Sequence, residues 1–144
     1  MSRENAEVSG NLIKVEIVTP SRLVASDEVE MVVAPGEGGS FGVLHNHVPF
    51  LCALRTGEVK LKKGEKTLRY ALSAGFFEMS ENKVIILADG AERAQEIDVE
   101  RAQAARDRSV KRLDQADTDL SIDIERAKAA LLRAQNRLKI AEIK

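Results

Sequence analysis

The chain has 144 residues, of which 44% are hydrophobic and 3% aromatic, and its formal net charge is −1. This length accommodates one domain or two small ones, and the near-neutral charge argues against nucleic acid as a general partner. The single cysteine, Cys52, excludes an internal disulfide and is typical of a reducing compartment. No apolar run reaches the ~20 residues that span a bilayer, and the polar N-terminus predicts no targeting peptide, so we expect a soluble protein.

The composition changes abruptly near residue 90. All nine glycines, all three prolines, both histidines and every aromatic residue lie in residues 1–90. From Ala91 to Lys144 the chain is rich in Ala, Leu, Arg, Lys, Glu and Asp, which lose little side-chain entropy in a helix. We therefore expect two domains, residues 1–90 and residues 91–144.

The first domain is predicted to consist of short strands. Apolar and charged residues alternate from Ile13 to Ile17, which is the pattern of a half-buried strand. Gly64 predicts a hairpin turn, and Glu81-Asn82 predicts another tight turn. Because no helical crossover separates the strands, we expect an antiparallel β-sandwich rather than a parallel sheet. The further predicted strands cover residues 23–25, 29–34, 51–54, 58–62, 67–72, 75–79 and 83–88.

Residues 35–50 interrupt this pattern and are predicted to form a loop. The run Pro35–Ser40 contains three glycines, but no Gly-Lys-Ser or Gly-Lys-Thr follows, so it is not a phosphate-binding loop. Two interpretations remain: a surface loop that needs positive φ angles, or a loop whose backbone closely approaches another protein.

His45 and His47 suggest a metal site. Two histidines at i and i+2 on a strand share one face, and Cys52 is the only soft candidate for a third ligand. A small metal-dependent hydrolase that uses these three residues is therefore one alternative function.

The second domain is predicted to be an antiparallel pair of helices. Asp98 is suited to cap a first helix that runs to about Ala116, and Thr118 or Asp119 is suited to cap a second helix. Small and apolar residues recur on one stripe of each helix, so the two helices can approach closely. Because alanine buries little surface, we expect this hairpin to be marginally stable and to dock reversibly on the first domain. The stripe residues are Ala102, Ala105, Ser109, Leu113 and Ala116, and then Ile124, Ala127, Leu131, Ala134, Leu138 and Ala141.

Charged residues of the second domain form a pattern of their own. Asp98, Arg101 and Arg108 fall on one side of the first helix, while Arg133 and Arg137 are i, i+4 neighbours on the second. Glu92 precedes the first helix. If the chain turns near Thr118, these guanidiniums converge into a cradle for a polyphosphate. The alternative is a solvated face with ordinary helix ion pairs.

Taken together, these segments resemble the epsilon subunit family of bacterial F-type ATP synthases over nearly the whole chain. The run Ser40–Pro49 is similar to a loop pattern of that family, and the runs 71–76 and 84–88 are similar to its later strands. The segment Ala91–Ala94, followed by Ile97-Asp98-Val99-Glu100-Arg101-Ala102, resembles the I/L-D-x-x-R-A motif of its ATP-binding members.

The resemblance implies a ten-stranded sandwich that binds the gamma subunit and the c-subunit ring, and a two-helix regulatory domain. It implies a non-catalytic rotor subunit of the central stalk, at the cytoplasmic face of the bacterial membrane, that couples ion flow to ATP synthesis. The resemblance further implies that the subunit requires no cofactor and that ATP is a regulatory ligand that favours the folded state of the helices. Extended helices reach the alpha/beta hexamer and inhibit ATP hydrolysis. Two such states must lie within a few kcal/mol of each other.

The resemblance also assigns residues to these roles. ATP binding falls on Glu92, Asp98, Arg101, Arg108, Arg133 and Arg137. Contact with the c-ring and gamma falls on Glu37, Gly38, Gly39, Ser40, Phe41 and His47, although some members have an acid where this chain has Ser40. Contact with the hexamer falls on Arg126, Lys128, Arg133 and Arg137. Besides the hydrolase, a chaperone-like adaptor whose hairpin grips clients remains an alternative.

Overall fold

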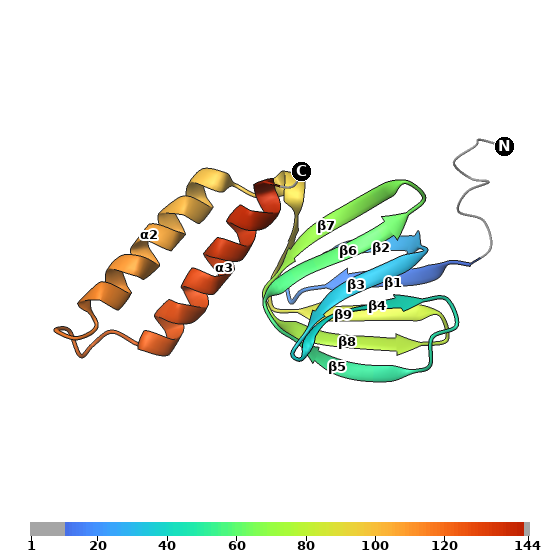
Figure 1. Cartoon of the computed structure of the whole chain (residues 1–144), viewed down its shortest axis with the longest axis horizontal. Coiled ribbons are helices and arrows are strands. Elements are labelled where there is room, and N and C mark those ends of the chain that lie inside the picture. Colours follow the sequence, from blue (N-terminus) through green and yellow to red (C-terminus); the bar gives the residue numbers. More distant parts are fainter. Residues whose placement is uncertain (1–10, 143–144) are drawn as a thin grey trace. The chain divides into compact units, whose positions relative to one another are not determined.

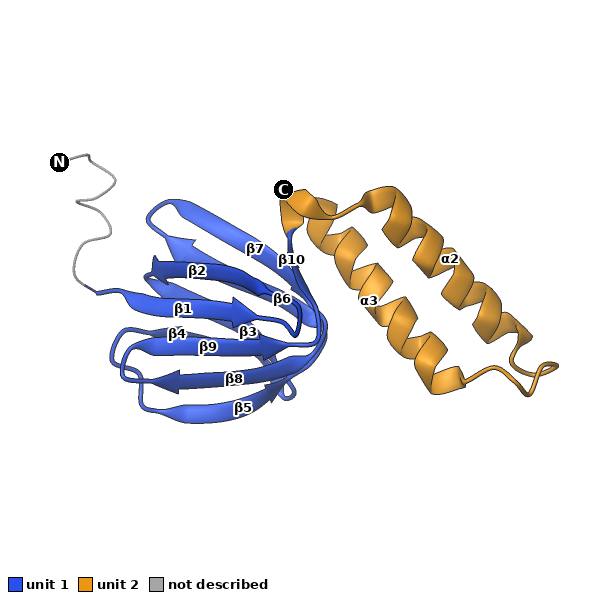
Figure 2. Cartoon of the chain, turned by 180° about the vertical axis from the view of Figure 1, so that it is seen from behind, with its two compact units in different colours: residues 1–93 blue, residues 94–144 orange. Residues whose placement is uncertain are grey.

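The computed structural model of the chain describes residues 11–142, which form two compact units that meet between Arg93 and Ala94 (Figures 1 and 2). Within residues 11–142, the first unit contains ten strands, and the second contains a short 3-10 helix and two α-helices. The predicted fold class, a β-sandwich followed by a two-helix hairpin, is confirmed. The strands are β1 (Ile13–Val18), β2 (Leu23–Val29), β3 (Met31–Gly36), β4 (Gly39–Leu44), β5 (Phe50–Leu54), β6 (Gly57–Lys63), β7 (Lys66–Leu72), β8 (Gly75–Ser80), β9 (Lys83–Ala88) and β10 (Ala91–Arg93).

The strands belong to one continuous sheet that folds over on itself. Their order is β10-β7-β6-β3-β5-β8-β9-β1-β2, and β4 pairs with β3 beside this path. The sheet crosses from one layer to the other between β3 and β5, where a single residue pair, Gly36 opposite Leu54, joins the two strands. One layer is therefore β2-β1-β9-β8-β5, and the other contains β10, β7, β6, β3 and β4 (Figure 1).

One ladder of the sheet is parallel, which corrects the prediction of purely antiparallel pairing. β1 runs parallel to β9 from Lys14 opposite Lys83 to Val18 opposite Leu87. The absence of helical crossovers excludes parallel pairing only between strands that follow each other closely in the chain. Here the connection between β1 and β9 consists of seven intervening strands, so no helix is needed.

The loop predicted at residues 35–50 is another point that the structure corrects. Pro35 and Gly36 are buried in β3, and the chain turns at Glu37-Gly38 and returns as β4. The ladder between β3 and β4 continues down to Gly36 opposite Gly39, so pairing and inward packing outweigh the poor strand propensity of glycine. Within residues 35–50, only the turn Glu37-Gly38 and the segment between β4 and β5 remain outside a strand.

Apolar side chains from both layers fill the sandwich. Phe41, Phe50 and Phe77 meet at ring-centroid distances of 4.9 to 5.5 Å, where β4, β8 and β5 come together. Phe77 is fully buried, whereas Phe41 and Phe50 are partly buried. Such aromatic pairs add about 0.5–1.5 kcal/mol each to the burial of their surface.

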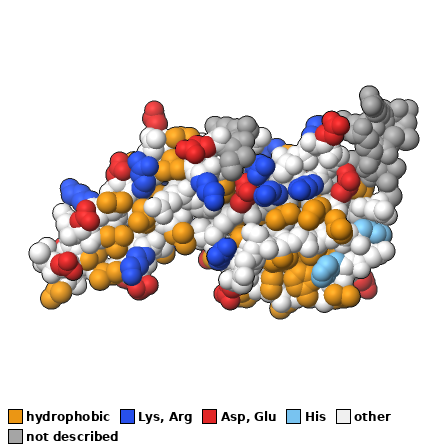
Figure 3. Space-filling view, in the orientation of Figure 1, with side chains coloured by type: hydrophobic (Ala, Val, Ile, Leu, Met, Phe, Trp, Pro, Cys, Tyr) orange, Lys and Arg blue, Asp and Glu red, His pale blue; other side chains and the backbone are white. Residues whose placement is uncertain are grey.

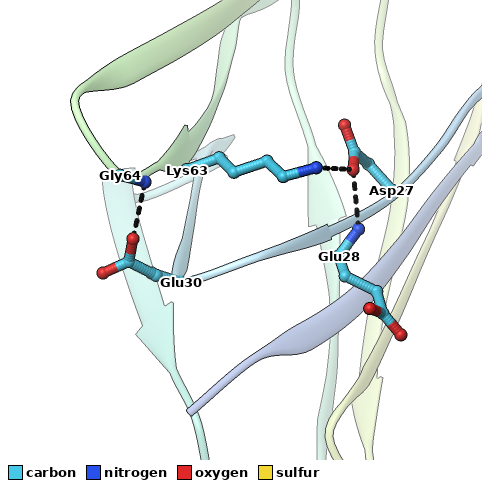
Figure 4. Close-up of polar contacts among 5 residues, drawn as sticks. All are labelled: Asp27, Glu28, Glu30, Lys63 and Gly64. Atoms are coloured by element: carbon cyan, nitrogen blue, oxygen red, sulfur yellow. Dashed lines mark hydrogen bonds and ion pairs between the residues drawn. The ribbon is translucent and has the colours of Figure 1, made fainter. Parts of the chain in front are cut away.

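A polar cluster joins the edge strand β2 to the turn between β6 and β7 (Figure 4). Lys63 Nζ donates to Asp27 Oδ1 at 3.0 Å, and the Gly64 N–H donates to Glu30 Oε1 at 2.6 Å. Gly64 has a φ of 59°, which agrees with the predicted glycine turn. The first bond holds β2 against the other layer, where the strand order shows no ladder, and the second holds the residue that joins β2 to β3.

The helical unit contains η1 (Ala94–Glu96), α2 (Val99–Gln115) and α3 (Ile124–Glu142), with α2 and α3 packed side by side (Figure 1). Asp98 caps α2 as predicted, since its Oδ1 accepts the Arg101 N–H at 3.1 Å. The cap of α3 was predicted wrongly. It is Asp123, whose Oδ1 accepts the Arg126 N–H at 3.1 Å, while Asp119 binds the Ser121 N–H and hydroxyl in the preceding turn.

The seam between the helices is narrow. Its buried residues are alanines and Ser109, whose hydroxyl donates to the Ala105 carbonyl within its own helix. The buried residues of α2 and α3 are Ala102, Ser109, Ala127, Ala134, Ile140 and Ala141.

Among the described residues, no helix is long and apolar enough to cross a membrane.

Candidate functional site

An apolar row crosses the outer face of one layer of the sandwich. In the sheet register Leu23 lies opposite Val18, Val18 opposite Leu87, Leu87 opposite Phe76, and Phe76 opposite Ala53. Leu23, Leu87 and Phe76 are 53–56% exposed, although all three are large hydrophobic side chains. An exposed apolar band that spans five strands marks an interaction surface.

A hollow of about 550 Å³ adjoins this apolar row. Phe76, Leu87 and Ala53 line it together with the turns that end β1, β3, β7 and β9. Its two carboxylates are Glu37 and Asp89. The hollow therefore combines an apolar floor with a negative rim, and it suits an apolar or basic segment of another protein.

The apolar row was not predicted from the sequence, although the sequence contains a pattern that indicates it. Phe76-Phe77 and Ile85-Ile86-Leu87 are consecutive apolar residues within strands. Adjacent residues of a strand point to opposite faces, so such runs place apolar side chains on the outside as well as in the core.

The residues predicted to contact the c-ring and gamma lie at two ends of β4. Glu37 and Gly38 form the β3–β4 turn, Gly39 begins β4, and Ser40 is exposed on that strand. His47 follows the other end of β4, a strand that is about 17 Å long at the usual rise per residue. Phe41 points inward to Phe50 and Phe77. The structure thus separates one predicted loop into two surfaces.

His45 and His47 do not share a strand face. They lie in the turn between β4 and β5, with Asn46 between them at a φ of 66°. Within residues 11–142, no three side chains of His, Cys, Asp or Glu gather as metal ligands. Burial, and then the charge of Glu37, raises the pKa of the Cys52 thiol, which disfavours the thiolate that a metal binds. The hydrolase alternative gains no support.

Most of the predicted ATP-binding residues lie on one face of the helical hairpin. Arg101 and Arg108 each immediately precede a seam residue of α2, and Arg133 immediately precedes a seam residue of α3. Each arginine is therefore offset from the following seam residue by about 100° around the helix axis. Antiparallel helices are related by an approximate twofold axis normal to the pair, so equal offsets lie on the same face.

Arg137, one turn after Arg133, lies on the same side of α3. We call Arg101, Arg108, Arg133 and Arg137 the arginine face. Asp98 also borders it, with one carboxylate oxygen used in the helix cap. Glu92, in contrast, belongs to β10 of the sandwich unit, opposite Ala71.

The residues predicted to contact the hexamer divide between two sides of α3. Arg126 precedes the seam residue Ala127 and therefore extends the arginine face. Lys128 follows Ala127, on the opposite side, and forms an ion pair with Glu125 at 3.8 Å. Each guanidinium offers a planar set of N–H donors that matches a phosphate or a carboxylate, so the arginine face is suited to either.

The fold is therefore a sandwich with an apolar outer row, followed by a hairpin with a basic face. Residues 12–94 match the family model described as ATP synthase, delta/epsilon chain, beta-sandwich domain, and residues 95–142 match the long alpha-helix domain of the same chain. The chain belongs to the delta/epsilon chain family of ATP synthases.

Individual relatives agree with this assignment. The ATP synthase epsilon chain of Nitratidesulfovibrio vulgaris is 50% identical over 103 residues, which cover 72% of this chain and 77% of that protein. The epsilon chain of Desulforamulus reducens is 44% identical over 107 residues, 74% of this chain and 81% of its own. The resemblance to an epsilon subunit, a part of a larger complex rather than an enzyme by itself, is confirmed.

The fold also occurs in a solved structure of an ATP synthase. A chain in the OSCP/F1/c-ring structure of the Euglena gracilis mitochondrial ATP synthase superimposes with a TM-score of 0.75 at 20% identity. The alignment covers 94% of this chain and 86% of the other. At this identity the likeness concerns the fold alone.

Proposed function

We propose that the chain is the non-catalytic epsilon subunit of the central stalk of an F-type ATP synthase, where it couples ion translocation to ATP synthesis. The observation that carries this proposal is the match of both family domains, in order, to the two units of the fold. In this role the subunit is a peripheral protein at the cytoplasmic face of the bacterial membrane, held there by the complex.

The sandwich supplies the contacts to the rotor. The apolar row docks on the gamma subunit, because three large side chains that are 53–56% exposed lose contact with water there. The turns at both ends of β4 contribute the remaining contacts with gamma and with the c-ring. Glu37 and Ser40 at one end, and His47 at the other, are exposed polar residues in or beside these turns.

The hairpin supplies the regulation. The arginine face binds the phosphates of ATP and thereby favours the folded pair of helices, while the extended helices present the same arginines to acidic segments of the alpha/beta hexamer and inhibit ATP hydrolysis. The narrow seam supports this proposal, because a hairpin held mainly by alanine separates at a small cost in free energy. No cofactor is required, and ATP acts as a regulatory ligand.

Two measurements test the proposal with the full-length protein. Mixed with the gamma subunit of the same organism, it is expected to elute as a stable complex in size-exclusion chromatography. Titrated alone with ATP, it is expected to become more compact in small-angle scattering. A protein that binds gamma but ignores millimolar ATP lacks the regulatory function, and one that binds no subunit of the complex lacks the rotor function.

A further inference from the structure

The turn between β4 and β5 has a backbone shape that its own residues only partly specify. The His47 N–H donates to the Leu44 carbonyl at 3.1 Å, which closes a four-residue turn, and Asn46 occupies its third position with a φ of 66°. A turn with positive φ at the third position is the place of glycine or asparagine. Unlike glycine, asparagine brings a side chain that can be held from outside the turn.

The turn between β8 and β9 supplies that outside contact. Glu81 and Asn82 have φ angles of 49° and 59° and join the paired ends Ser80 and Lys83, as in a two-residue hairpin turn. Asn82 contacts two other segments from this position. Its carbonyl accepts the Lys14 N–H at 3.0 Å, which fixes the start of β1, and its side chain reaches Asn46.

Two hydrogen bonds join Asn46 and Asn82. The Asn46 N–H donates to Asn82 Oδ1 at 2.6 Å, and Asn82 Nδ2 donates to Asn46 Oδ1 at 3.1 Å. We call this pair the amide clamp. It connects turns that are 36 residues apart in the chain, and it holds the residue that directly precedes His47.

The clamp acts on an exposed surface. His47 and Val48 are exposed, Val48 by 70%, and Leu51 on the following strand is 68% exposed. The centroids of the His47 and Phe50 rings lie 5.0 Å apart, and His47 Nδ1 lies 2.7 Å from the Val48 carbonyl oxygen, while the clamp holds the backbone just before His47. Figure 3 shows hydrophobic side chains gathered on the sandwich beside the two histidines.

We propose that Asn82 is a positioning residue for docking: through the amide clamp it holds the β4–β5 turn, with His47 and Val48, in the conformation that binds the rotor. This inference rests on the proposed function, because the gamma subunit is the partner for which the turn is held ready. A turn ordered before binding loses less conformational entropy on association, so the clamp raises affinity without touching the partner.

The test compares two glycine variants of one hairpin turn in the full-length protein. Asn82→Gly keeps the positive φ and the carbonyl that binds Lys14 but removes the clamp. Glu81→Gly is the matched control, because it adds a glycine to the same turn and leaves both clamp side chains intact. Amide hydrogen exchange of Asn46 is followed by NMR, and affinity for the gamma subunit is followed by calorimetry.

Asn82→Gly is expected to speed the exchange of the Asn46 amide and to weaken gamma binding about two- to tenfold, the factor that one net hydrogen bond contributes. Glu81→Gly is expected to change neither. Unchanged affinity in Asn82→Gly, or an equal loss in both variants, overturns the inference. If the wild-type protein itself does not bind gamma, the proposed function fails, and the exchange of Asn46 still decides whether the clamp orders the turn.

Discussion

Arg133 lies half-buried on the arginine face, one position before the seam residue Ala134. Arg133→Ala is expected to weaken ATP binding about tenfold to a hundredfold, because a hydrogen bond to a charged group contributes ~1.5–3 kcal/mol. Isothermal titration calorimetry of the full-length protein measures this change. Lys128→Ala is the matched control, since it removes a positive charge from the opposite side of the same helix. Equal losses of ATP affinity in both variants would show that ATP binding depends only on the net charge of the helix.

Asp123 caps α3 through its side chain and its carbonyl. Asp123→Ala is expected to lower the free energy of unfolding of the helical unit by ~1 kcal/mol, as is usual for the loss of an N-cap. Thermal unfolding followed by circular dichroism measures the effect. Asp119→Ala, in the preceding turn, is expected to have a smaller effect, and the reverse order would place the cap where the sequence first suggested it.

The two caps show what residue types reveal about helix starts. Asp98 stands directly before a long helical stretch, so its role could be predicted. Between Ala116 and Ile124, however, Thr118, Asp119 and Asp123 are all suitable cap residues. The choice depends on the length of the turn that lets α3 pack on α2, and this length is a property of the packed hairpin rather than of any one residue.

At the scale of elements, the apolar row gives the sharpest test of docking. Phe76→Glu is expected to weaken gamma binding at least about tenfold, because it replaces a buried contact by a charge that must be desolvated. The side chain is 56% exposed in the free protein, so the fold is expected to tolerate the change. Pull-down with gamma measures the effect.

Thr67→Glu places the same new charge on an exposed position of β7, in the other layer. The affinity of the Thr67→Glu variant for the gamma subunit is expected to equal that of the wild-type protein. A comparable loss of gamma binding in Thr67→Glu would mean that binding depends on the charge of the whole sandwich rather than on contact with the apolar row.

Strand prediction succeeded where apolar and polar residues alternate and failed where glycine is frequent. β1 and β6 follow this alternation closely, whereas β4 contains Gly39 and Gly42, and its sequence predicts a loop. Its strand character comes from its ladder with β3, which no local pattern reveals. The arginine face was predictable because helical periodicity alone places Arg101 beside Arg108 and Arg133 beside Arg137.

At the scale of the whole molecule, the two units differ in how much apolar surface they bury. The sandwich core contains large side chains such as Phe77, Ile13 and Leu61, whereas four of the six buried residues of α2 and α3 are alanines. We expect amides of α2 and α3 to exchange with solvent at least about tenfold faster than those of β8 and β9, as measured by mass spectrometry.

Saturating ATP is expected to slow exchange in the helical unit and to leave the sandwich unchanged, because a ligand stabilises the state to which it binds. Uniform exchange throughout the described residues, with or without ATP, would instead indicate one cooperative body without a separable regulatory hairpin.

The parallel ladder between β1 and β9 has a consequence for synthesis of the chain. β1 leaves the ribosome early, but the strand that completes its pairing begins only at Lys83. Until then the nascent polypeptide carries a half-paired amphipathic edge, so assembly of the sandwich is delayed by its own topology. Products released before that point, by a premature stop or by proteolysis, are expected to aggregate rather than to persist as shortened subunits.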